Sequence, residues 1–116
     1  MRLMNSGEKC VGALFLCFSA SFAVVASETL SMQEGTDLAK RSACLACHQV
    51  DAKRVGPSFK QIAARYADSS DAMDHLGDSI RNGGRGKWGA VPMPAQRHVN
   101  EENTKALAQW ILSMKP

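Results

Sequence analysis

Aromatic residues are scarce in this chain of 116 residues, at 6% of the total, and no segment alternates apolar and polar residues convincingly. We therefore expect no β-strands. Excess charge is also scarce, because 14 lysines and arginines face 11 aspartates and glutamates and leave a net charge of +3. This excess is too weak to indicate a nucleic-acid-binding surface. The length fits one small domain.

One long apolar run is present, and it lies near the N-terminus. Basic residues precede it, and it extends over residues 11–25 and is followed by the small residue Ala26. This order predicts a secretory signal peptide, residues 1–26, whose cleavage leaves residues 27–116 without a membrane anchor. A retained anchor is the alternative, but the run is short for a membrane span.

The remaining domain, residues 27–116, has little material for an apolar core. Its aromatic residues are Phe59, Tyr66, Trp88 and Trp110. A domain of this size buries a smaller fraction of its surface than a larger domain does, so a poor core is normally supplemented from outside the chain. We therefore expect a large buried cofactor.

Four segments of this domain show the apolar spacing that is typical of helices. We expect helices at about residues 35–43, from residue 57 or 58 onward, at about residues 71–82, and after Asn100. The side chains expected to face the core in the last three are Phe59, Ile62, Ala63, Tyr66, Met73, Leu76, Ile80, Leu107, Trp110, Ile111 and Met114.

Polar residues mark the starts of these helices. Ser70 and Asn100 are candidate N-caps of the third and fourth helices. For the first helix, Ser31 followed by Glu34 fits a capping box, and Thr36 is the alternative cap. Paired glycines at positions 83 and 84 are expected to end the third helix.

Residues 83–96 cannot form regular structure, because they include four glycines and two prolines. Loops of this length in small domains are usually functional or disordered. Trp88 and Met93 lie within this loop, and both side chains are costly to leave in water. We therefore expect a functional loop.

The run Cys44-Leu45-Ala46-Cys47-His48 matches the attachment pattern for c-type haem. Two thiols at this spacing can form thioethers to the two vinyl groups of one porphyrin, which places the histidine on one face of the ring. Three alternatives compete. A dithiol redox pair expects a βαβ setting, a zinc site lacks a second ligand pair, and a disulfide across two residues would restrain the unfolded chain little.

The iron of such a haem needs a second axial ligand, or it stays open for catalysis. The candidate side chains are Met32, Met73, Met93, Met114, His75 and His98. Met93 is favoured, because the rings of Pro92 and Pro94 fix the backbone on either side of it. His98 is the main alternative. A thioether is a soft, neutral ligand that favours Fe(II).

Three stretches of the chain form a larger pattern, namely Cys44-x-x-Cys47-His48, Val55-Gly56-Pro57 and Trp88-Gly89-x-Val91-Pro92-Met93-Pro94. Together they resemble the class I c-type cytochromes of bacteria, in particular the small cytochrome c-551 type, over about residues 35–115. The resemblance implies an all-α fold in which four to five helices surround one covalently bound haem c. The first and last helices would cross, with Leu38 against Leu107 and Ile111.

The same resemblance implies roles for individual residues. Cys44 and Cys47 would carry the haem, and His48 and Met93 would bind its iron as the two metal ligands. The carbonyl of Pro57 would accept a hydrogen bond from Nδ1 of His48 and so orient the imidazole.

Further roles lie at the edge of the haem, where the sequence also departs from the family. Trp88 would direct its indole N–H to a haem propionate. Gln96 stands where the family often has asparagine, and it could still donate to the ligand sulfur. Ser79 replaces a frequent propionate-binding arginine, which leaves that task to Trp88 and Arg81.

The implied function is that of a soluble periplasmic monohaem electron carrier rather than an enzyme. It would shuttle single electrons between respiratory donors and a terminal reductase or oxidase, and a nitrite reductase is one partner that the family implies. A monomer would dock transiently on redox partner proteins. Five basic residues in the loops expected beside the haem would steer acidic partners, namely Lys53, Arg54, Arg85, Lys87 and Arg97. The alternative is a haem enzyme or gas sensor with a labile sixth ligand.

Overall fold

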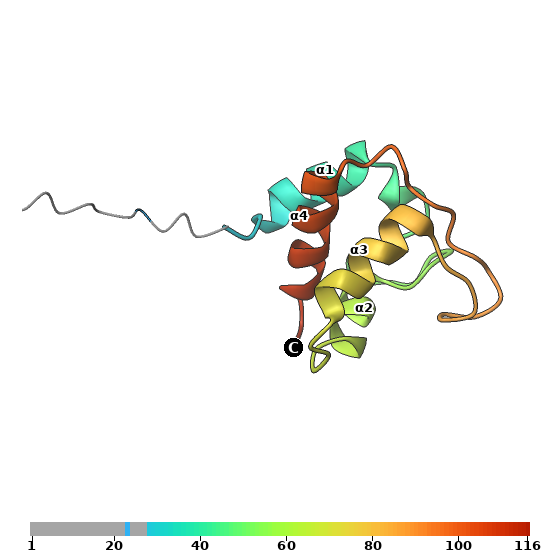
Figure 1. The fold of residues 1–116 in the computed structure, drawn as a ribbon. Coiled ribbons are helices and arrows are strands. Elements are labelled where there is room, and N and C mark those ends of the chain that lie inside the picture. The colour runs from blue at the N-terminus through green and yellow to red at the C-terminus, as the bar shows by residue number, and fades with distance from the viewer. Residues whose placement is uncertain (1–22, 24–27) are drawn as a thin grey trace, which may run out of the picture.

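The computed structural model describes Ala23 and residues 28–116, so the signal peptide predicted at residues 1–26 lies, except for Ala23, outside the described residues. Four α-helices and one 3-10 turn follow in the order α1 (Met32–Arg41), η1 (Cys44–Ala46), α2 (Phe59–Arg65), α3 (Ala72–Asn82) and α4 (Glu101–Leu112) (Figure 1). Within the described part of the chain no β-strand forms, and no helix is long and apolar enough to cross a membrane. The predicted all-α architecture is confirmed.

Helix α1 begins at a capping box, in which two side chains satisfy amide groups at the helix start. The Ser31 hydroxyl accepts from the Glu34 amide at 3.3 Å, and the Glu34 carboxylate accepts from the Ser31 amide at 2.9 Å. Thr36 lies inside the helix and donates its hydroxyl to the Met32 carbonyl at 2.7 Å. Ser31 is therefore the cap of the two alternatives, and the helix begins at Met32 rather than at residue 35.

Side-chain caps also start α2 and α4, close to the predicted positions. The Ser58 hydroxyl accepts from the Gln61 amide at 3.1 Å, and the Gln61 side chain accepts from the Ser58 amide at 2.9 Å. The Asn100 side chain accepts from the Asn103 amide at 2.8 Å, as expected for the N-cap of α4.

Helix α3 differs from its prediction in two details. Asp71, not Ser70, is the N-cap, and it makes no side-chain capping bond to the helix. Met73 is 40% exposed, so the expectation that it faces the core is wrong. The buried residues of α3 are Ala72, Leu76 and Ile80, and their spacing of four forms a stripe in which Ala72 occupies the place assigned to Met73.

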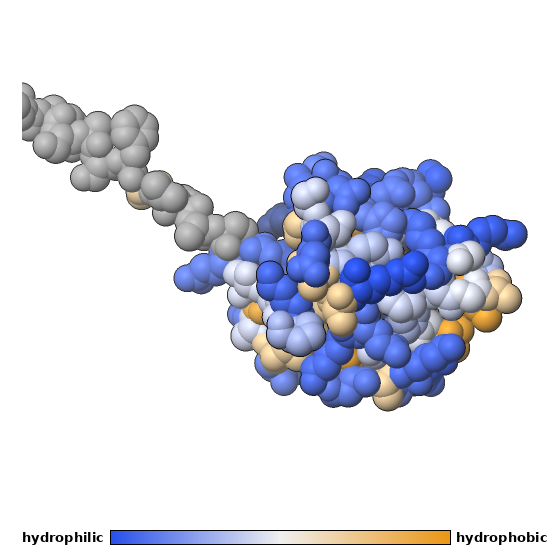
Figure 2. All heavy atoms as spheres, turned by 90° about the horizontal axis from the view of Figure 1, so that it is seen from below, coloured by the Kyte–Doolittle hydropathy of each residue, from blue (hydrophilic) through white to orange (hydrophobic). Residues whose placement is uncertain are grey.

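Helix α4 is the centre of the core, because α1, α2 and α3 all pack against it. Leu107 and Trp110 of α4 are almost completely buried. Leu38 joins Leu107 and Ile111 in one apolar cluster, so the predicted contact between the first and last helices is confirmed. Polar side chains cover most of the face shown in Figure 2, where apolar areas are few and small.

Helix α1 approaches α4 closely at Gly35. A Cβ atom at this position would lie 2.1 Å from Cε2 of Trp110, so only glycine allows the indole to lie against the backbone. The Trp110 indole also meets the ring of Phe59 in an edge-on contact, with ring centroids 5.2 Å apart. The buried Nε1 of Trp110 finds no hydrogen-bond partner among the described residues, so packing alone holds this side chain.

Replacement of Gly35 by alanine tests this close approach. The added methyl group must displace the Trp110 indole, and we expect Gly35→Ala to lower the free energy of unfolding by about 1–3 kcal/mol in urea titrations. Gly77→Ala is the matched control, because a Cβ at this α3 glycine would lie 3.8 Å from the nearest side-chain atom, which is ordinary contact. The control should be neutral or stabilising by about 0.5–1 kcal/mol. Equal effects of the two substitutions would contradict the argument.

Candidate functional site

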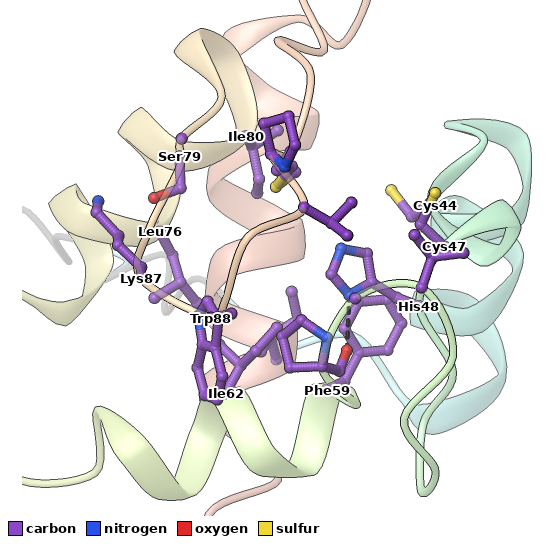
Figure 3. A pocket seen from close by; sticks show the side chains of 18 of the residues that line it. Cys44, Cys47, His48, Phe59, Ile62, Leu76, Ser79, Ile80, Lys87 and Trp88 are labelled. Carbon is purple, nitrogen blue, oxygen red and sulfur yellow. Dashed lines mark hydrogen bonds between the residues drawn. The ribbon is translucent and has the colours of Figure 1, made fainter.

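A large cavity opens between the 44–48 segment, the three helices α2, α3 and α4, and the loop of residues 83–96 (Figure 3). Together with the open space at its mouth it encloses about 1100 Å³. Much of its wall is apolar and includes Phe59, Ile62, Leu76, Ile80, Leu107 and Ile111. The cavity therefore suits a large, mainly apolar ligand.

Both cysteines of the predicted attachment motif lie in one wall of this cavity. A left-handed residue, Ala43 with φ of 62°, precedes the 3-10 turn that brings Cys44 and Cys47 together. The two are free thiols, so the disulfide alternative does not describe this structure. Burial raises the pKa of the Cys44 thiol. The zinc alternative is also unsupported, because the described residues contain no cluster of three or more metal-ligating side chains.

His48 lies in the same wall, and its environment fixes the state of its imidazole. The ring is 8% exposed, and Nδ1 lies 2.7 Å from the carbonyl oxygen of Pro57, as predicted. Because a carbonyl can only accept, Nδ1 carries the proton and Nε2 keeps a free lone pair. Phe59 stacks on the ring at 5.4 Å, which fixes its plane. An imidazole held in this way is well suited to bind a metal through Nε2.

Gly56 makes this arrangement possible. Its amide donates to the Cys47 carbonyl at 2.8 Å and so closes the loop that returns the chain to His48. A Cβ atom at position 56 would lie 2.7 Å from Cε1 of His48. The pattern Val55-Gly56-Pro57 does not reveal this role from the sequence, because Gly56 approaches His48 only once the loop is folded.

Met93 lines the cavity on the opposite segment, and its backbone is held firmly. It forms a two-bond bridge with Gly84, with lengths of 3.0 and 2.8 Å. Gly83, at φ of 74°, lies beside it, and a Cβ there would be 2.4 Å from the Met93 carbonyl oxygen. The loop at residues 83–96 is thus irregular but ordered by specific contacts, as predicted.

The other candidate axial ligands are placed less well than Met93. His98, the main alternative, points its Nε2 to the Ser42 carbonyl at 3.2 Å and does not line the cavity. His75 does line it, but its Nε2 lies 2.8 Å from the Tyr66 hydroxyl and 3.3 Å from Nζ of Lys87. The remaining methionines among the candidates, Met32, Met73 and Met114, do not line it.

Trp88 lies at the mouth of the cavity and is 37% exposed. Figure 3 shows its indole among the side chains that line the cavity. The guanidinium group of Arg65, at the end of α2, lies over the ring at 4.4 Å from its centroid. The sequence offered no signal for Arg65, because a single arginine in the last turn of a helix is usually a solvated surface residue.

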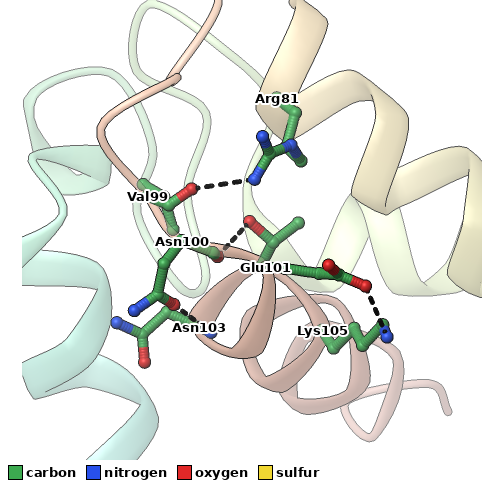
Figure 4. A network of polar contacts seen from close by, with 7 residues as sticks. Arg81, Val99, Asn100, Glu101, Asn103 and Lys105 are labelled. Carbon is green, nitrogen blue, oxygen red and sulfur yellow. Dashed lines mark hydrogen bonds and ion pairs between the residues drawn. The ribbon is translucent and has the colours of Figure 1, made fainter.

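Two long side chains considered for the haem edge, Gln96 and Arg81, bond to backbone carbonyls in this structure. Gln96 donates its side-chain amide to the Pro94 carbonyl at 2.9 Å instead of reaching the Met93 sulfur. Arg81 donates to the Val99 carbonyl at 3.3 Å, beside the start of α4, and is not part of the cavity wall (Figure 4). In both cases the side chain donates to a backbone carbonyl that lies close to it.

Comparison with known proteins decides the family. The model of the cytochrome c family matches residues 32–115. The chain belongs to the cytochrome c family. It is 48% identical to cytochrome c-552 of Nitrosomonas europaea over 98 residues, which cover 84% of this chain and 92% of that relative. It is 46% identical to cytochrome c-551 of Pseudomonas denitrificans over 81 residues, or 70% of this chain and 98% of the other.

Solved structures of cytochromes agree with this assignment. The crystal structure of wild-type Nitrosomonas europaea cytochrome c552 superposes with a TM-score of 0.67 at 51% identity, covering 69% of this chain and 99% of that one. The crystal structure of the class 1 cytochrome MtoD of Sideroxydans lithotrophicus superposes with a TM-score of 0.61 at 30% identity, covering 69% of this chain and 91% of that one. The predicted resemblance to class I cytochromes is confirmed.

Cytochromes c bind a covalently attached haem c, and Cys44, Cys47 and His48 fit the attachment motif. The residues present fit such a group, because the cavity is large and apolar and the paired Nδ1 of His48 leaves one imidazole nitrogen free to bind. When bound, the haem supplies a one-electron redox centre. This cytochrome is therefore a monohaem electron-transfer protein, and its relatives are electron-transfer cytochromes rather than enzymes.

The close approach at Gly56 yields a direct test of the imidazole position. We expect Gly56→Ala to displace the His48 ring and to lower the free energy of unfolding by about 1–3 kcal/mol, measured by urea titration of the haem-containing protein. Gly77→Ala is the control, because a Cβ at that position makes only ordinary contact at 3.8 Å and Gly77 does not line the cavity. If both variants unfold like the wild type, His48 does not depend on this glycine.

Proposed function

We propose that this protein is a soluble periplasmic electron carrier in which His48 and Met93 bind the haem iron from opposite faces. Cys44 and Cys47 hold the haem through two thioethers. The observation that carries the proposal is the 2.7 Å contact of Nδ1 of His48 with the Pro57 carbonyl, which leaves Nε2 as the free nitrogen. The thioether of Met93, on another segment of the cavity wall, is the second ligand.

Two strong axial ligands explain a carrier better than a catalyst. If His48 and Met93 both held the iron, no position would remain for a substrate, and the site would change little when one electron was gained or lost. The neutral thioether favours Fe(II) and raises the reduction potential. The Met93 backbone is fixed by the bridge to Gly84, so the ligand is presented without a large rearrangement.

Trp88 marks the edge through which electrons pass. It lies at the partly exposed mouth of the cavity, where it donates its indole N–H to a haem propionate. Two further apolar residues of the cavity wall, Val55 and Val91, are 50% and 63% exposed. They provide a small apolar contact surface, which is what a brief electron-transfer encounter needs.

Exposed basic residues around the mouth of the cavity favour partners with acidic docking surfaces. Arg85 and Lys87 both belong to the cavity wall and are exposed, and Lys53 and Arg54 are exposed in the loop that follows the attachment motif. A basic rim of this kind steers acidic docking surfaces and raises the association rate. We propose that respiratory donors and a terminal reductase or oxidase dock here, on a monomer released into the periplasm by cleavage of residues 1–26.

Loss of the thioether tests the second ligand. We expect Met93→Ala to let carbon monoxide bind rapidly to the reduced protein and to lower the reduction potential by on the order of 0.1 V, a fraction of the ~0.8 V range set by axial ligands. Met73→Ala, which removes an exposed methionine that does not line the cavity, should change neither. Rapid carbon monoxide binding by the wild type would instead favour a haem enzyme or gas sensor.

Removal of rim charges tests the docking surface. We expect the double variant Arg85→Gln and Lys87→Gln to associate with an acidic redox partner about two- to tenfold more slowly at low salt, with a weaker dependence on ionic strength. Lys40→Gln with Lys115→Gln removes the same charge away from the cavity and should have little effect. Stopped-flow kinetics at several salt concentrations measures both. Equal slowing by the two pairs would refute a localised steering surface.

A further inference from the structure

Arg65 makes three contacts at the mouth of the cavity, although it is not part of the cavity wall. Its guanidinium lies 4.4 Å from the centroid of the Trp88 ring and 5.8 Å from that of Tyr66. One of its nitrogens, Nη1, donates a hydrogen bond to the carbonyl oxygen of Lys87. The same side chain therefore contacts both the ring of Trp88 and the backbone immediately before it.

The loop itself does little to fix Trp88. Gly86 and Gly89, on either side of it, have φ values of 79° and 110°, and no atom lies within 4 Å of a Cβ built at either position. Glycines with positive φ and open surroundings leave the backbone free to adopt other conformations. Contacts from outside the loop therefore contribute to the orientation of the indole.

Helix α3 supplies a second outside contact, but to a different residue. His75 lies 3.3 Å from Nζ of Lys87 through its Nε2, which is also 2.8 Å from the Tyr66 hydroxyl. These contacts hold the Lys87 side chain and leave Trp88 untouched. Among the polar and ring contacts of the described residues, only those of Arg65 reach the indole face.

A cation over an indole has two physical effects. It is attracted to the negative face of the ring and so fixes the plane of the side chain. It also draws electron density from the ring, which makes the N–H at its edge a stronger donor. An arginine does this better than a lysine, because its planar guanidinium can stack on the ring and donate to a carbonyl at the same time.

We propose that Arg65 is a positioning residue that sets the orientation and donor strength of the Trp88 indole N–H, and through it the reduction potential. The second part rests on the proposed function, because it requires Trp88 to donate to a haem carboxylate. The first part concerns only the contact between Arg65 and Trp88.

The test follows the Trp88 indole N–H by NMR in the reduced, haem-containing protein. Trp88→Phe identifies the signal, and the buried indole of Trp110 is an internal reference. We expect Arg65→Gln to speed exchange of the Trp88 N–H about two- to fivefold relative to Trp110 and to lower the equilibrium constant for reduction by a similar factor. Arg65→Lys should restore part of the potential, because it keeps the charge, but less of the protection.

Lys40→Gln is the control for charge alone, because it removes one exposed cation from α1, away from the cavity wall. It should change neither exchange nor potential. If Arg65→Gln leaves the exchange rate of Trp88 at the wild-type value, Arg65 does not position the indole. If Lys40→Gln lowers the potential as much as Arg65→Gln, net charge and not the stacked contact is responsible.

The contact of Arg65 with Trp88 and its effect on the reduction potential can be refuted independently. If Trp88→Phe leaves the potential unchanged, the propionate contact proposed for Trp88 is refuted, and so is the route from Arg65 to the potential. Nuclear Overhauser contacts between the Arg65 side chain and the Trp88 ring protons then decide whether Arg65 positions the ring, because they depend on no haem contact. Retention of the wild-type visible spectrum in every variant shows that the haem and its axial ligands are intact.

Discussion

The hydrogen bond from Nδ1 of His48 to the Pro57 carbonyl is the interaction on which the rest of the site depends. It requires the chain to fold back on itself, which the bond from the Gly56 amide to the Cys47 carbonyl achieves. It also ties the site to the core. Phe59 stacks on the imidazole and meets Trp110 edge-on, so Phe59 links the His48 ring to Trp110, the largest fully buried side chain among the described residues.

The cavity and the apolar core are made of the same residues. Leu76, Ile80, Leu107 and Ile111 belong to both, so the haem of a cytochrome c completes a core that the chain alone leaves open. This explains why so few aromatic residues suffice for a domain of this size. The side of α4 that faces away from the cavity is closed differently, by the direct contact of Gly35 with the Trp110 indole.

Much of this could be predicted from the sequence, because helix periodicity, the attachment motif and the Pro92-Met93-Pro94 segment are local patterns. The choice between two candidate N-caps could not be predicted. Ser31 and Thr36 both fit the start of α1, and only the hydrogen bond between the Ser31 amide and the Glu34 carboxylate decides between them. The prediction for Met73 is wrong because either Ala72 or Met73 could begin the buried face of α3 that continues with Leu76 and Ile80. The contacts of Gln96, Arg81 and Arg65 could not be predicted either, because the partners of these long side chains are set by the folded chain.

The bridge between Gly84 and Met93 uses both the amide and the carbonyl of residue 93. The course of the main chain at this point is thus independent of what its side chain binds. An exchange such as Met93→His would therefore change the chemical character of the donor while the peptide that carries it stays in place. If Met93 is the ligand proposed above, this loop fixes where the ligand stands without fixing which side chain it is, so the electronic properties of the protein could change at residue 93 without refolding.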